Sequence, residues 1–428
     1  MKLSAFPHAI VNFLRDYHDL LKSGLFMHCA YSRRYFKTGA LQWLALAHYI
    51  LIGEARGHRP NPFFDPHYFE RAAKTYRLID YVRQMPLWVH PTSDYFDSRW
   101  YINTYTASLA TNENPLQHFW LKGFDTGYSP SPRFDMQFFL RAIARDRADR
   151  RDYAYDYACT ADPAMPLNSA ELETRQNAFY AGIAFEIIRR IAIPQKRFLV
   201  FIQAGRGFQS KYDLANASFD LLLNYYDDSD YVGDAQYVFR QRGTKTTAIR
   251  KILDECPEVF LGYEAILFLD DDVVISQQQI ETLFETLVRH QLDLLQASVS
   301  EDSECYFPIL KQPVAGQGLR PVSGIEIMMP VVSQRALREC GWVFKEGISG
   351  WAVDTLLSAK VRKRFGNTIA LLGDVIAVHA RATDVANNSF YKFLSQHGIN
   401  PTVEAGKIAM KFDLNDKMSA VEFAPPIA

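Results

Sequence analysis

The sequence has few cysteines, and its apolar runs are short. Its 5 cysteines are widely spaced, odd in number and include no Cys-x-x-Cys pair. This pattern predicts reduced thiols in a reducing compartment and argues against a disulfide framework or a zinc site. The apolar run nearest to a membrane span, residues 41–53, contains His48 and is too short to cross a bilayer. We therefore expect a cytoplasmic protein, and peripheral contact with the inner face of the membrane stays open.

Neither sign of charge dominates. The formal net charge is −1, which argues against broad electrostatic binding to nucleic acid. The first residues lack a small-residue cleavage site and soon become charged, so they do not predict a signal peptide. The hydrophobic content of 48% and the charged content of 22% are typical of a globular protein, and 428 residues allow two or three domains.

The N-terminal region repeats itself at an offset of 70 residues. The segments from His48 to Asp65 and from His118 to Asp135 share the pattern His-aromatic-x3-Gly-x3-Gly-x2-Pro-x-Pro-x-Phe-Asp. A match of this length in a fixed register marks a duplicated structural unit. It predicts a helix, a glycine turn, a Pro-x-Pro segment and a second helix that the aspartate caps.

The glycines, prolines and aromatic residues of the repeat favour a role in fixing turns and a small helical core over a role in catalysis. We expect His48 and His118 to pack against these turns. If the region has a function of its own, docking to a protein or to a membrane is favoured over chemistry. The predicted organisation is a helical domain over residues 1–160, a linker helix over 161–192 and an α/β domain over 193–428.

The most informative stretch is Ala-Ile-Leu-Phe-Leu-Asp-Asp-Asp-Val-Val-Ile, residues 265–275. Its apolar run predicts a parallel strand that is buried on both faces. Asp270, Asp271 and Asp272 would then lie where the strand leaves the core, at the edge where open α/β sheets bind ligands. Neighbouring carboxylates repel one another unless a cation joins them, and hard divalent metals prefer oxygen ligands. A solvated acidic loop is the alternative.

The segments around this strand alternate between strands and helices. Ser276 and Gln279 have the spacing of a capping box, which predicts a helix directly after the acids. Further strands are predicted at 197–203, 219–226, 237–240, 292–297, 325–329, 368–372 and 375–379, and helices at 169–190 and 352–364. This order predicts an α/β fold.

Motifs in the second half resemble bacterial GT-A-fold glycosyltransferases, and most closely a glycosyltransferase-like family of unknown function shared by bacteria and plants. The motifs are FDLLLNYYD (219–227), GTKTTAIRKIL (243–253), ILFLDDDV (266–273), IEIMMPVVS (325–333) and SGWAVD (349–354). The N-terminal units resemble an FD…NPLxHFxxxGxxxGxxPxPxFD repeat that is often joined to bacterial sugar transferases. One departure is Ala352, where the family pattern has Gly.

The resemblance implies a Rossmann-like, mostly parallel GT-A domain after a mainly α-helical repeat domain. It implies a metal-dependent enzyme that moves a sugar from a UDP- or GDP-sugar to a bacterial surface glycan or a lipid-linked glycan, such as O-antigen or capsule. Asp272 would ligate Mn²⁺ or Mg²⁺, Asp270 would hold the ribose or a metal-bound water, and His379 would be a further metal ligand. The alternative for His379 is a histidine that is merely hydrogen-bonded.

Other polar residues are candidates for binding the nucleotide sugar. Asp271 belongs to the same acidic cluster. Lys245 precedes a predicted helix and could neutralise the diphosphate, a task for which Lys and Arg are suited. Asp227 could accept a hydrogen bond from the base or ribose, or cap its turn. Arg381 could meet a phosphate oxygen, or be exposed.

Asp354 is the leading candidate for the catalytic base. It follows Ser-Gly-Trp, and a carboxylate beside the flat ring of Trp351 suits the binding of an acceptor sugar and the deprotonation of its hydroxyl. Such a base supports an inverting displacement. The alternative is that Asp354 caps a helix while Trp351 packs in the core. Glu326 is a second candidate for the same role.

Two other functions stay open. A nucleotidyltransferase would use the same acids and metal, but it would cleave between phosphates. A non-catalytic scaffold of a polysaccharide-assembly complex would have the same fold but would not catalyse sugar transfer.

Overall fold

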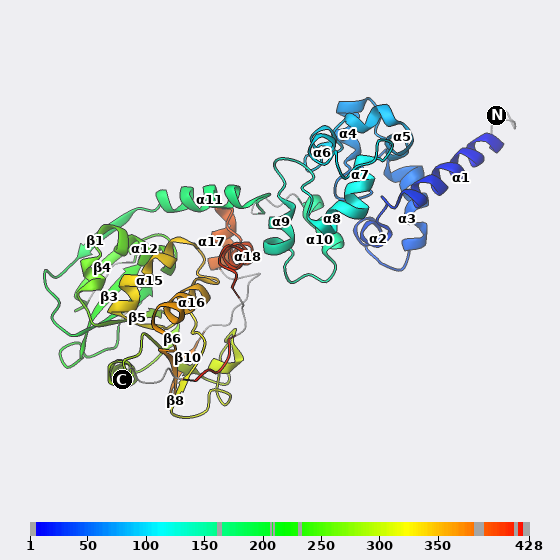
Figure 1. Ribbon diagram of the computed structural model, residues 1–428. Coiled ribbons are helices and arrows are strands. Elements are labelled where there is room, and N and C mark those ends of the chain that lie inside the picture. The colour runs from blue at the N-terminus through cyan, green and yellow to red at the C-terminus, as the bar shows by residue number, and fades with distance from the viewer. Residues whose placement is uncertain are drawn as a thin grey trace. The chain divides into compact units, whose positions relative to one another are not determined.

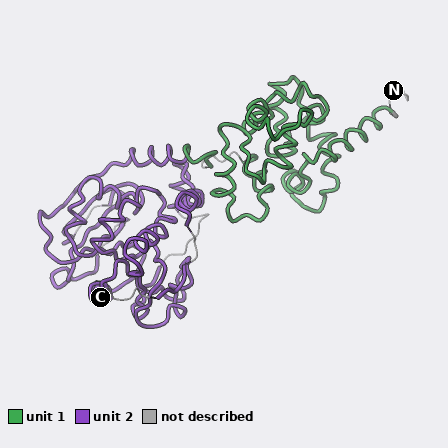
Figure 2. Tube along the Cα trace, in the orientation of Figure 1, with its two compact units in different colours: residues 1–171 green, residues 172–428 purple. Residues whose placement is uncertain are grey.

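The structure is a computed structural model that describes residues 6–160, 165–205, 208, 210–229, 233–380, 389–414 and 418–422. It consists of two compact units, Met1–Glu171 and Leu172–Ala428 (Figures 1 and 2). The division lies inside the segment that the sequence predicts as a linker. Among the described residues, no helix is both long enough and apolar enough to span a bilayer.

The first unit is helical. Its elements are α1 (Phe6–Ser23), α2 (His28–Phe36), α3 (Gln42–His48), η1 (Tyr49–Gly53), α4 (Pro66–Ala73), α5 (Leu78–Arg83), η2 (Met85–Val89), α6 (Ser98–Thr104), α7 (Pro115–His118), η3 (Phe119–Gly123), α8 (Phe124–Thr126), α9 (Met136–Phe138), η4 (Phe139–Ile143) and α10 (Arg150–Thr160). Short helices separated by glycine and proline turns follow from the punctuation of the repeat pattern.

The two sequence repeats form matching contacts. In the first, the hydroxyl of Tyr31 lies 2.9 Å from Nδ1 of His48, and in the second the hydroxyl of Tyr101 lies 2.9 Å from Nδ1 of His118. A Cβ on Gly53 would lie 2.1 Å from the Tyr31 hydroxyl oxygen, so only glycine allows the turn to approach this pair. These histidines therefore hold the turns of the repeat through buried tyrosines.

The caps of the repeat are also duplicated. The Asp65 carboxylate accepts from the backbone N–H of Tyr68 at the start of α4, and Asp135 accepts from Phe138 in the same way at α9. Each carboxylate satisfies a free N–H group of a first helical turn.

The second unit is a mixed α/β structure, which confirms the predicted fold class. Its helices are α11 (Ser169–Ala181, which begins in the first unit), α12 (Lys245–Glu255), α13 (Glu258–Leu261), α14 (Gln277–Arg289), η5 (Pro308–Leu310), α15 (Gln334–Cys340), η6 (Gly341–Lys345), α16 (Val353–Phe365), α17 (Ser389–Gln396) and α18 (Pro401–Phe412). Its strands are β1 (Phe185–Arg189), β2 (Phe198–Ala204), β3 (Phe219–Tyr225), β4 (Tyr237–Gln241), β5 (Ala265–Asp270), β6 (Val273–Val274), β7 (Leu294–Val299), β8 (Leu319–Pro321), β9 (Val331–Ser333) and β10 (Ile369–His379).

Over the described residues, the strands form one sheet in the order β1-β4-β3-β2-β5-β9-β7-β10-β6, with β8 also paired to β10. Strands β2 to β5 are mutually parallel. The short β9 is antiparallel to both β5 and β7, so β7 and its parallel neighbour β10 run in the direction of β5. The carboxyl ends of β2, β3, β5 and β10 therefore lie at the same edge of a largely parallel sheet.

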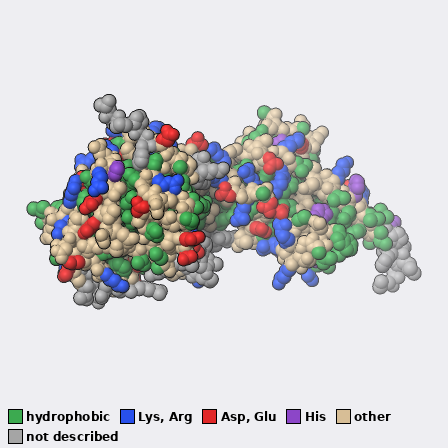
Figure 3. Space-filling view, turned by 90° about the horizontal axis from the view of Figure 1, so that it is seen from below, with side chains coloured by type: hydrophobic (Ala, Val, Ile, Leu, Met, Phe, Trp, Pro, Cys, Tyr) green, Lys and Arg blue, Asp and Glu red, His purple; other side chains and the backbone are tan. Residues whose placement is uncertain are grey.

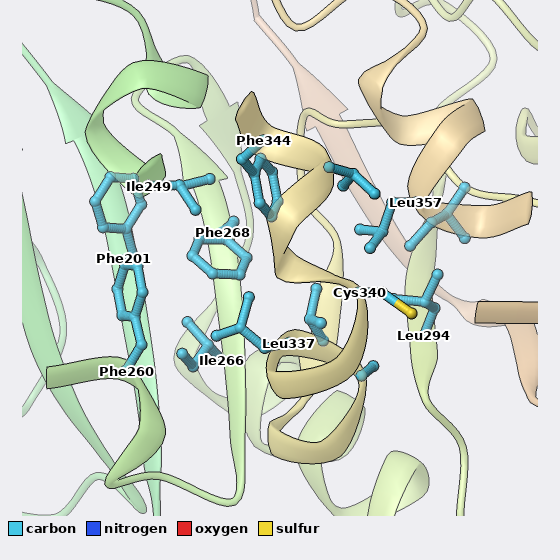
Figure 4. Packing of buried hydrophobic residues seen from close by; sticks show 14 of the residues in the cluster. Phe201, Ile249, Phe260, Ile266, Phe268, Leu294, Leu337, Cys340, Phe344 and Leu357 are labelled. Carbon is cyan, nitrogen blue, oxygen red and sulfur yellow. The ribbon is translucent and has the colours of Figure 1, made fainter. Parts of the chain in front are cut away.

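Both faces of the sheet are buried. On one face Phe201 and Phe268 of the sheet pack in a cluster with Ile249, Phe344 and Leu337, which come from α12, η6 and α15 (Figure 4). On the other face, α14 covers the sheet: its Phe284 stacks on Phe198 of β2 at a ring-centroid distance of 4.5 Å. The capping box predicted at the start of α14 is confirmed. Because both faces are covered, polar side chains gather where strands end.

Three predicted elements are wrong in detail. Residues 325–329 form no strand, because Gln296 and Asp354 side chains accept the backbone N–H groups of Glu326 and Ile327. The helix predicted over 169–190 ends at Ala181, and β1 follows, paired antiparallel to β4. The two strands predicted at 368–372 and 375–379 are one strand, β10, whose register with β7 shifts between them.

Candidate active site

The three consecutive acids lie at the carboxyl end of β5, as the apolar run predicts. Asp270 is the last residue of the strand, and Asp271 and Asp272 form the turn into β6. Each of the three carboxylates has a different set of partners, so the three acids have separate roles.

Asp271 joins the ends of two neighbouring strands. Its Oδ2 accepts from the backbone N–H of Gly205, after β2, at 3.1 Å and from the hydroxyl of Tyr226, after β3, at 3.2 Å. A Cβ at Gly205 would lie 2.1 Å from the Tyr226 ring, so a glycine is needed for this close approach. Asp271 therefore positions the strand ends that surround the acids.

Asp272 faces His379, the last residue of β10. Nε2 of His379 lies 3.6 Å from Oδ1 of Asp272, and Nδ1 lies 3.3 Å from the carbonyl oxygen of Glu304. A carbonyl oxygen only accepts, so Nδ1 carries the proton and donates. In a neutral ring, Nε2 then directs a lone pair towards a carboxylate, which also only accepts. This arrangement requires a proton or a cation between the two side chains.

The charge on Asp272 favours the proton in the protein alone. The carboxylate beside the ring raises the pKa of His379, although burial of the ring opposes the shift. The same two side chains provide an oxygen and a nitrogen ligand of the kind that Mn²⁺ accepts, and metal-binding histidines commonly donate their other N–H to a backbone carbonyl. The donor set therefore fits a divalent metal.

Asp270 has an internal counterion in Lys245, the first residue of α12. The ammonium nitrogen lies 2.7 Å from Oδ1 of Asp270, and it donates to the carbonyl oxygens of Ile327 at 2.5 Å and Met328 at 3.1 Å. Its three N–H groups thus have three protein acceptors, and the side chain is only 8% exposed. In this arrangement Lys245 has no donor left for a diphosphate. Burial raises the pKa of Asp270, and Lys245 opposes that shift.

Asp354 lies in the first turn of α16 and is partly buried. Its Oδ2 accepts from the backbone N–H of Ile327 at 3.1 Å, and its Oδ1 accepts from the backbone N–H of Thr355 at 2.7 Å. Burial, together with the nearby charge of Glu326, raises the pKa of Asp354 to about 7. A carboxylate with a pKa in this range can exchange a proton with substrate near neutral pH.

The turn before α16 contains Ala352, the residue that departs from the expected pattern. Ala352 precedes the helix with φ of 61°, in the left-handed region, where the absence of a Cβ makes glycine the favoured residue. Ala352 therefore has a backbone conformation that glycine adopts more readily, and the position is strained.

Glu326 is buried beside the same segment. Its Oε1 accepts from the backbone N–H of Tyr306 at 2.7 Å, and its Oε2 lies 3.4 Å from Sγ of Cys305. Burial raises the pKa of Glu326. Because these contacts fix the 303–306 loop, which also contacts His379 through Ser303, Glu326 links that loop to the site.

One residue, Ile327, connects the two halves of the candidate site through its backbone N–H and its carbonyl. The N–H of Ile327 donates to Asp354, and the carbonyl oxygen of the same residue accepts from Lys245, which reaches Asp270. The residues that the sequence predicts for metal binding and for catalysis are therefore joined by a short chain of hydrogen bonds and ion pairs.

The remaining candidates lie elsewhere or have other partners. Asp227 accepts from the backbone N–H of Ser229 at 3.0 Å, which caps the turn after β3. Trp351 is 37% exposed, and its ring meets that of Tyr391 edge-on at 6.1 Å, so it does not pack in the core. Arg381 lies outside the described residues.

Sequence reasoning missed the residues that hold these groups in place: Tyr226, Ser303, Cys305, Tyr306 and Gln296. Apart from Tyr226, which lies in the 219–227 motif, they belong to no motif, and the roles of all five depend on contacts with residues distant in the chain. Among the described residues, no group of three or more His, Cys, Asp or Glu side chains is arranged to hold a metal ion. Asp270 forms an ion pair with Lys245, so Asp272 and His379 are the two candidate metal ligands that face each other.

Comparisons with known proteins gave distant similarities. No family model and no curated protein matches the chain. Among solved structures, residues 1–349 of S. aureus TarS are 13% identical with a TM-score of 0.30, over 50% of this chain and 72% of that one. The complex of the same protein with UDP-GlcNAc gives 13% identity and a TM-score of 0.31, over 50% of this chain and 73% of that one.

Glucosyl-3-phosphoglycerate synthase from Mycobacterium tuberculosis, in complex with Mn²⁺, UDP-glucose and phosphoglyceric acid, is 14% identical. Its TM-score is 0.31, over 54% of this chain and 85% of that one. These scores are too low to support a shared activity.

Proposed function

We propose that the second unit is a metal-dependent glycosyltransferase of the GT-A type, which moves a sugar from a UDP- or GDP-sugar to an acceptor glycan. The observation that carries this proposal is the pair formed by Asp272 and His379. Asp272 and the unprotonated Nε2 of His379 are two acceptors facing each other at the end of the acidic strand, and a metal ion could replace the proton that otherwise lies between them. A metal ion there would supply positive charge to the diphosphate leaving group.

Asp272 and His379 are the proposed protein ligands of Mn²⁺ or Mg²⁺. Mg²⁺ in phosphate-handling sites takes one or two carboxylates and fills its other positions with phosphate oxygens and water, so two protein ligands suffice. Asp270, which Lys245 holds, would accept from the ribose or from a metal-bound water. Asp271 keeps the ends of β2 and β3 in place around the donor.

Asp354 is the proposed base. Its pKa of about 7 leaves a substantial ionised fraction at neutral pH, and the N–H of Ile327 donates to its carboxylate and fixes it in place. The carbonyl of Ile327 accepts from Lys245, which pairs with Asp270. It would remove the proton from the acceptor hydroxyl as that oxygen attacks the anomeric carbon, which gives inversion. Glu326 acts through the charge that raises the pKa of Asp354 and is the alternative base.

The exposed ring of Trp351 beside Tyr391 offers an aromatic surface near Asp354 for an acceptor sugar. The proposed acceptor is a bacterial surface glycan or its lipid-linked precursor, such as O-antigen or capsule.

Binding and turnover with nucleotide sugars test this proposal. Calorimetry with UDP- and GDP-sugars should show binding that requires Mn²⁺, and Asp272→Ala should abolish it. Asp354→Ala should keep donor binding and lose transfer. Asp374→Ala, which changes an exposed carboxylate in the strand of His379, is the matched control and should behave as the unmodified protein.

The product separates this function from its rivals. Release of UDP or GDP supports glycosyl transfer, whereas release of UMP or GMP would identify a nucleotidyltransferase. Donor binding that is unchanged in Asp272→Ala would remove the metal from the mechanism. Full transfer by Asp354→Ala would exclude Asp354 as the base. Absence of both donor binding and turnover across UDP- and GDP-sugars would favour the non-catalytic scaffold.

A further inference from the structure

Exposed apolar side chains are concentrated in three elements of the first unit. We call this set the apolar patch; it consists of Ile10, Val11, Leu14 and Leu21 of α1, Leu41, Trp43 and Leu44 at the start of α3, and Leu51 and Ile52 of η1. Val11, Trp43 and Leu51 are each more than 60% exposed. Figure 3 shows apolar side chains gathered at one end of this unit. Soluble proteins rarely leave such a surface uncovered without a partner.

The patch arises because α1 packs through its other face. Asp16, Leu20 and Ser23 of α1 are buried, whereas Ile10, Leu14 and Leu21 recur at helical spacing on the opposite side. The helix contacts α3 and η1 as well as α5, so the three elements that carry the patch are neighbours. A helix of 18 residues is about 27 Å long, which gives the surface a substantial length.

The segment that carries the patch is basic. The only acids in the first 53 residues are Asp16 and Asp19, against six lysines and arginines. Both acids are already paired: Asp16 with Arg77 and Arg83, and Asp19 with Arg83. Exposed cations nearby in the chain include Arg15, Lys22 and Lys37. This segment thus combines exposed apolar side chains with exposed cations and a positive net charge.

We propose that the apolar patch binds the surface of an anionic lipid bilayer, with α1 lying in the interface. An amphipathic helix with an apolar face, flanking lysines and a nearby tryptophan has the composition of interfacial helices. A second copy of the chain is disfavoured, because a two-fold contact through this patch would set the same cations against each other. Anionic headgroups instead supply the opposite charge.

Vesicle sedimentation with the full chain tests the proposal. Unmodified protein should bind vesicles of mixed phosphatidylcholine and phosphatidylglycerol and bind pure phosphatidylcholine at least about tenfold more weakly. Leu14→Asp with Trp43→Asp should weaken binding to the anionic vesicles by more than about tenfold, because both side chains leave the apolar phase. Ile193→Asp, at a 75% exposed apolar position in the second unit, should bind normally.

A second variant separates loss of binding from loss of folding. Lys22→Glu with Lys37→Glu keeps the apolar face, and it should lower affinity for anionic vesicles by more than about fivefold per reversed cation. Added salt should weaken binding of the unmodified protein. Absence of binding to anionic vesicles at low salt would overturn the proposal. So would equal binding by the charge-reversed variant, or self-association of the protein that Leu14→Asp abolishes in the absence of lipid.

Discussion

The ion pair between Lys245 and Asp270 makes a quantitative prediction about the site. Lys245→Met keeps an apolar stem of similar length but removes the ammonium, which satisfies one carboxylate and two backbone carbonyls. Asp270 would then remain a partly buried acid next to Asp272 with no internal counterion. We expect the second unit to lose stability.

The magnitude follows from burial and helix position. Removing one partner of a buried ion pair costs about 3–5 kcal/mol. Asp270 keeps 31% of its side chain exposed, and solvent screening there reduces the cost to roughly 2–3 kcal/mol. A cation at the first position of α12 opposes the helix dipole, so its removal is favourable by about 0.5 kcal/mol. The expected net loss in the free energy of unfolding is about 2 kcal/mol.

Urea denaturation near neutral pH measures this loss, and Lys251→Met is the matched control. Lys251 lies on the same helix and pairs with Glu255 at 3.0 Å, but this partner is 48% exposed, so the control should lose less than about 1 kcal/mol. The loss in Lys245→Met should shrink at acidic pH, because a protonated Asp270 needs no counterion. Equal, small losses in the two variants would refute the role of Lys245 as a buried counterion.

Four further predictions concern the fold and the candidate base. Ala352→Gly should stabilise the protein by about 0.5–1 kcal/mol in thermal or urea denaturation. The reason is that relief of the left-handed strain outweighs the greater conformational freedom that glycine gives the unfolded chain. A destabilised variant would contradict the strained turn. The transfer rate should rise with pH up to the pKa of Asp354, about 7, and then level off. This folded-state pKa lies above the unfolded value of about 3.9, so ionisation of Asp354 should lower the free energy of unfolding as pH rises between the two values. Asp354→Asn should remove this contribution to the pH dependence of stability. An unchanged pH dependence would count against the shifted pKa. Asp65→Ala should lower stability by about 0.5–2 kcal/mol through loss of the α4 cap, whereas an exposed mid-helix substitution such as Glu70→Ala should have little effect.

The structure gives a physical reason why the donor and acceptor sides of the proposed site would respond together. The carbonyl of Ile327 accepts from Lys245 and its N–H donates to Asp354, so a shift of this segment changes the surroundings of both side chains. Glu326, the preceding residue, holds the 303–306 loop and raises the pKa of Asp354. The irregular backbone at 325–329 is therefore part of the candidate site, although the sequence pattern predicts an ordinary strand there.

The sequence by itself determined the features that depend on local pattern. Unbroken apolar runs placed β2, β3 and β5, and the capping box placed the start of α14, because burial and capping act over a few neighbouring residues. The duplicated spacing placed His48 and His118 at equivalent turns, and the structure adds that each contacts a tyrosine at the same position of its repeat.

Only the tertiary structure decided which side chains neutralise one another. The Lys245 ammonium forms an ion pair with Asp270. His379 faces Asp272, although more than 100 residues separate these two in the sequence. Residues 325–329 do not form the predicted strand, because the side chains of Gln296 and Asp354 accept hydrogen bonds from the backbone N–H groups of Glu326 and Ile327. Which charges and hydrogen-bonding groups meet depends on the packing of distant segments, and a periodic pattern in the chain carries no information about it.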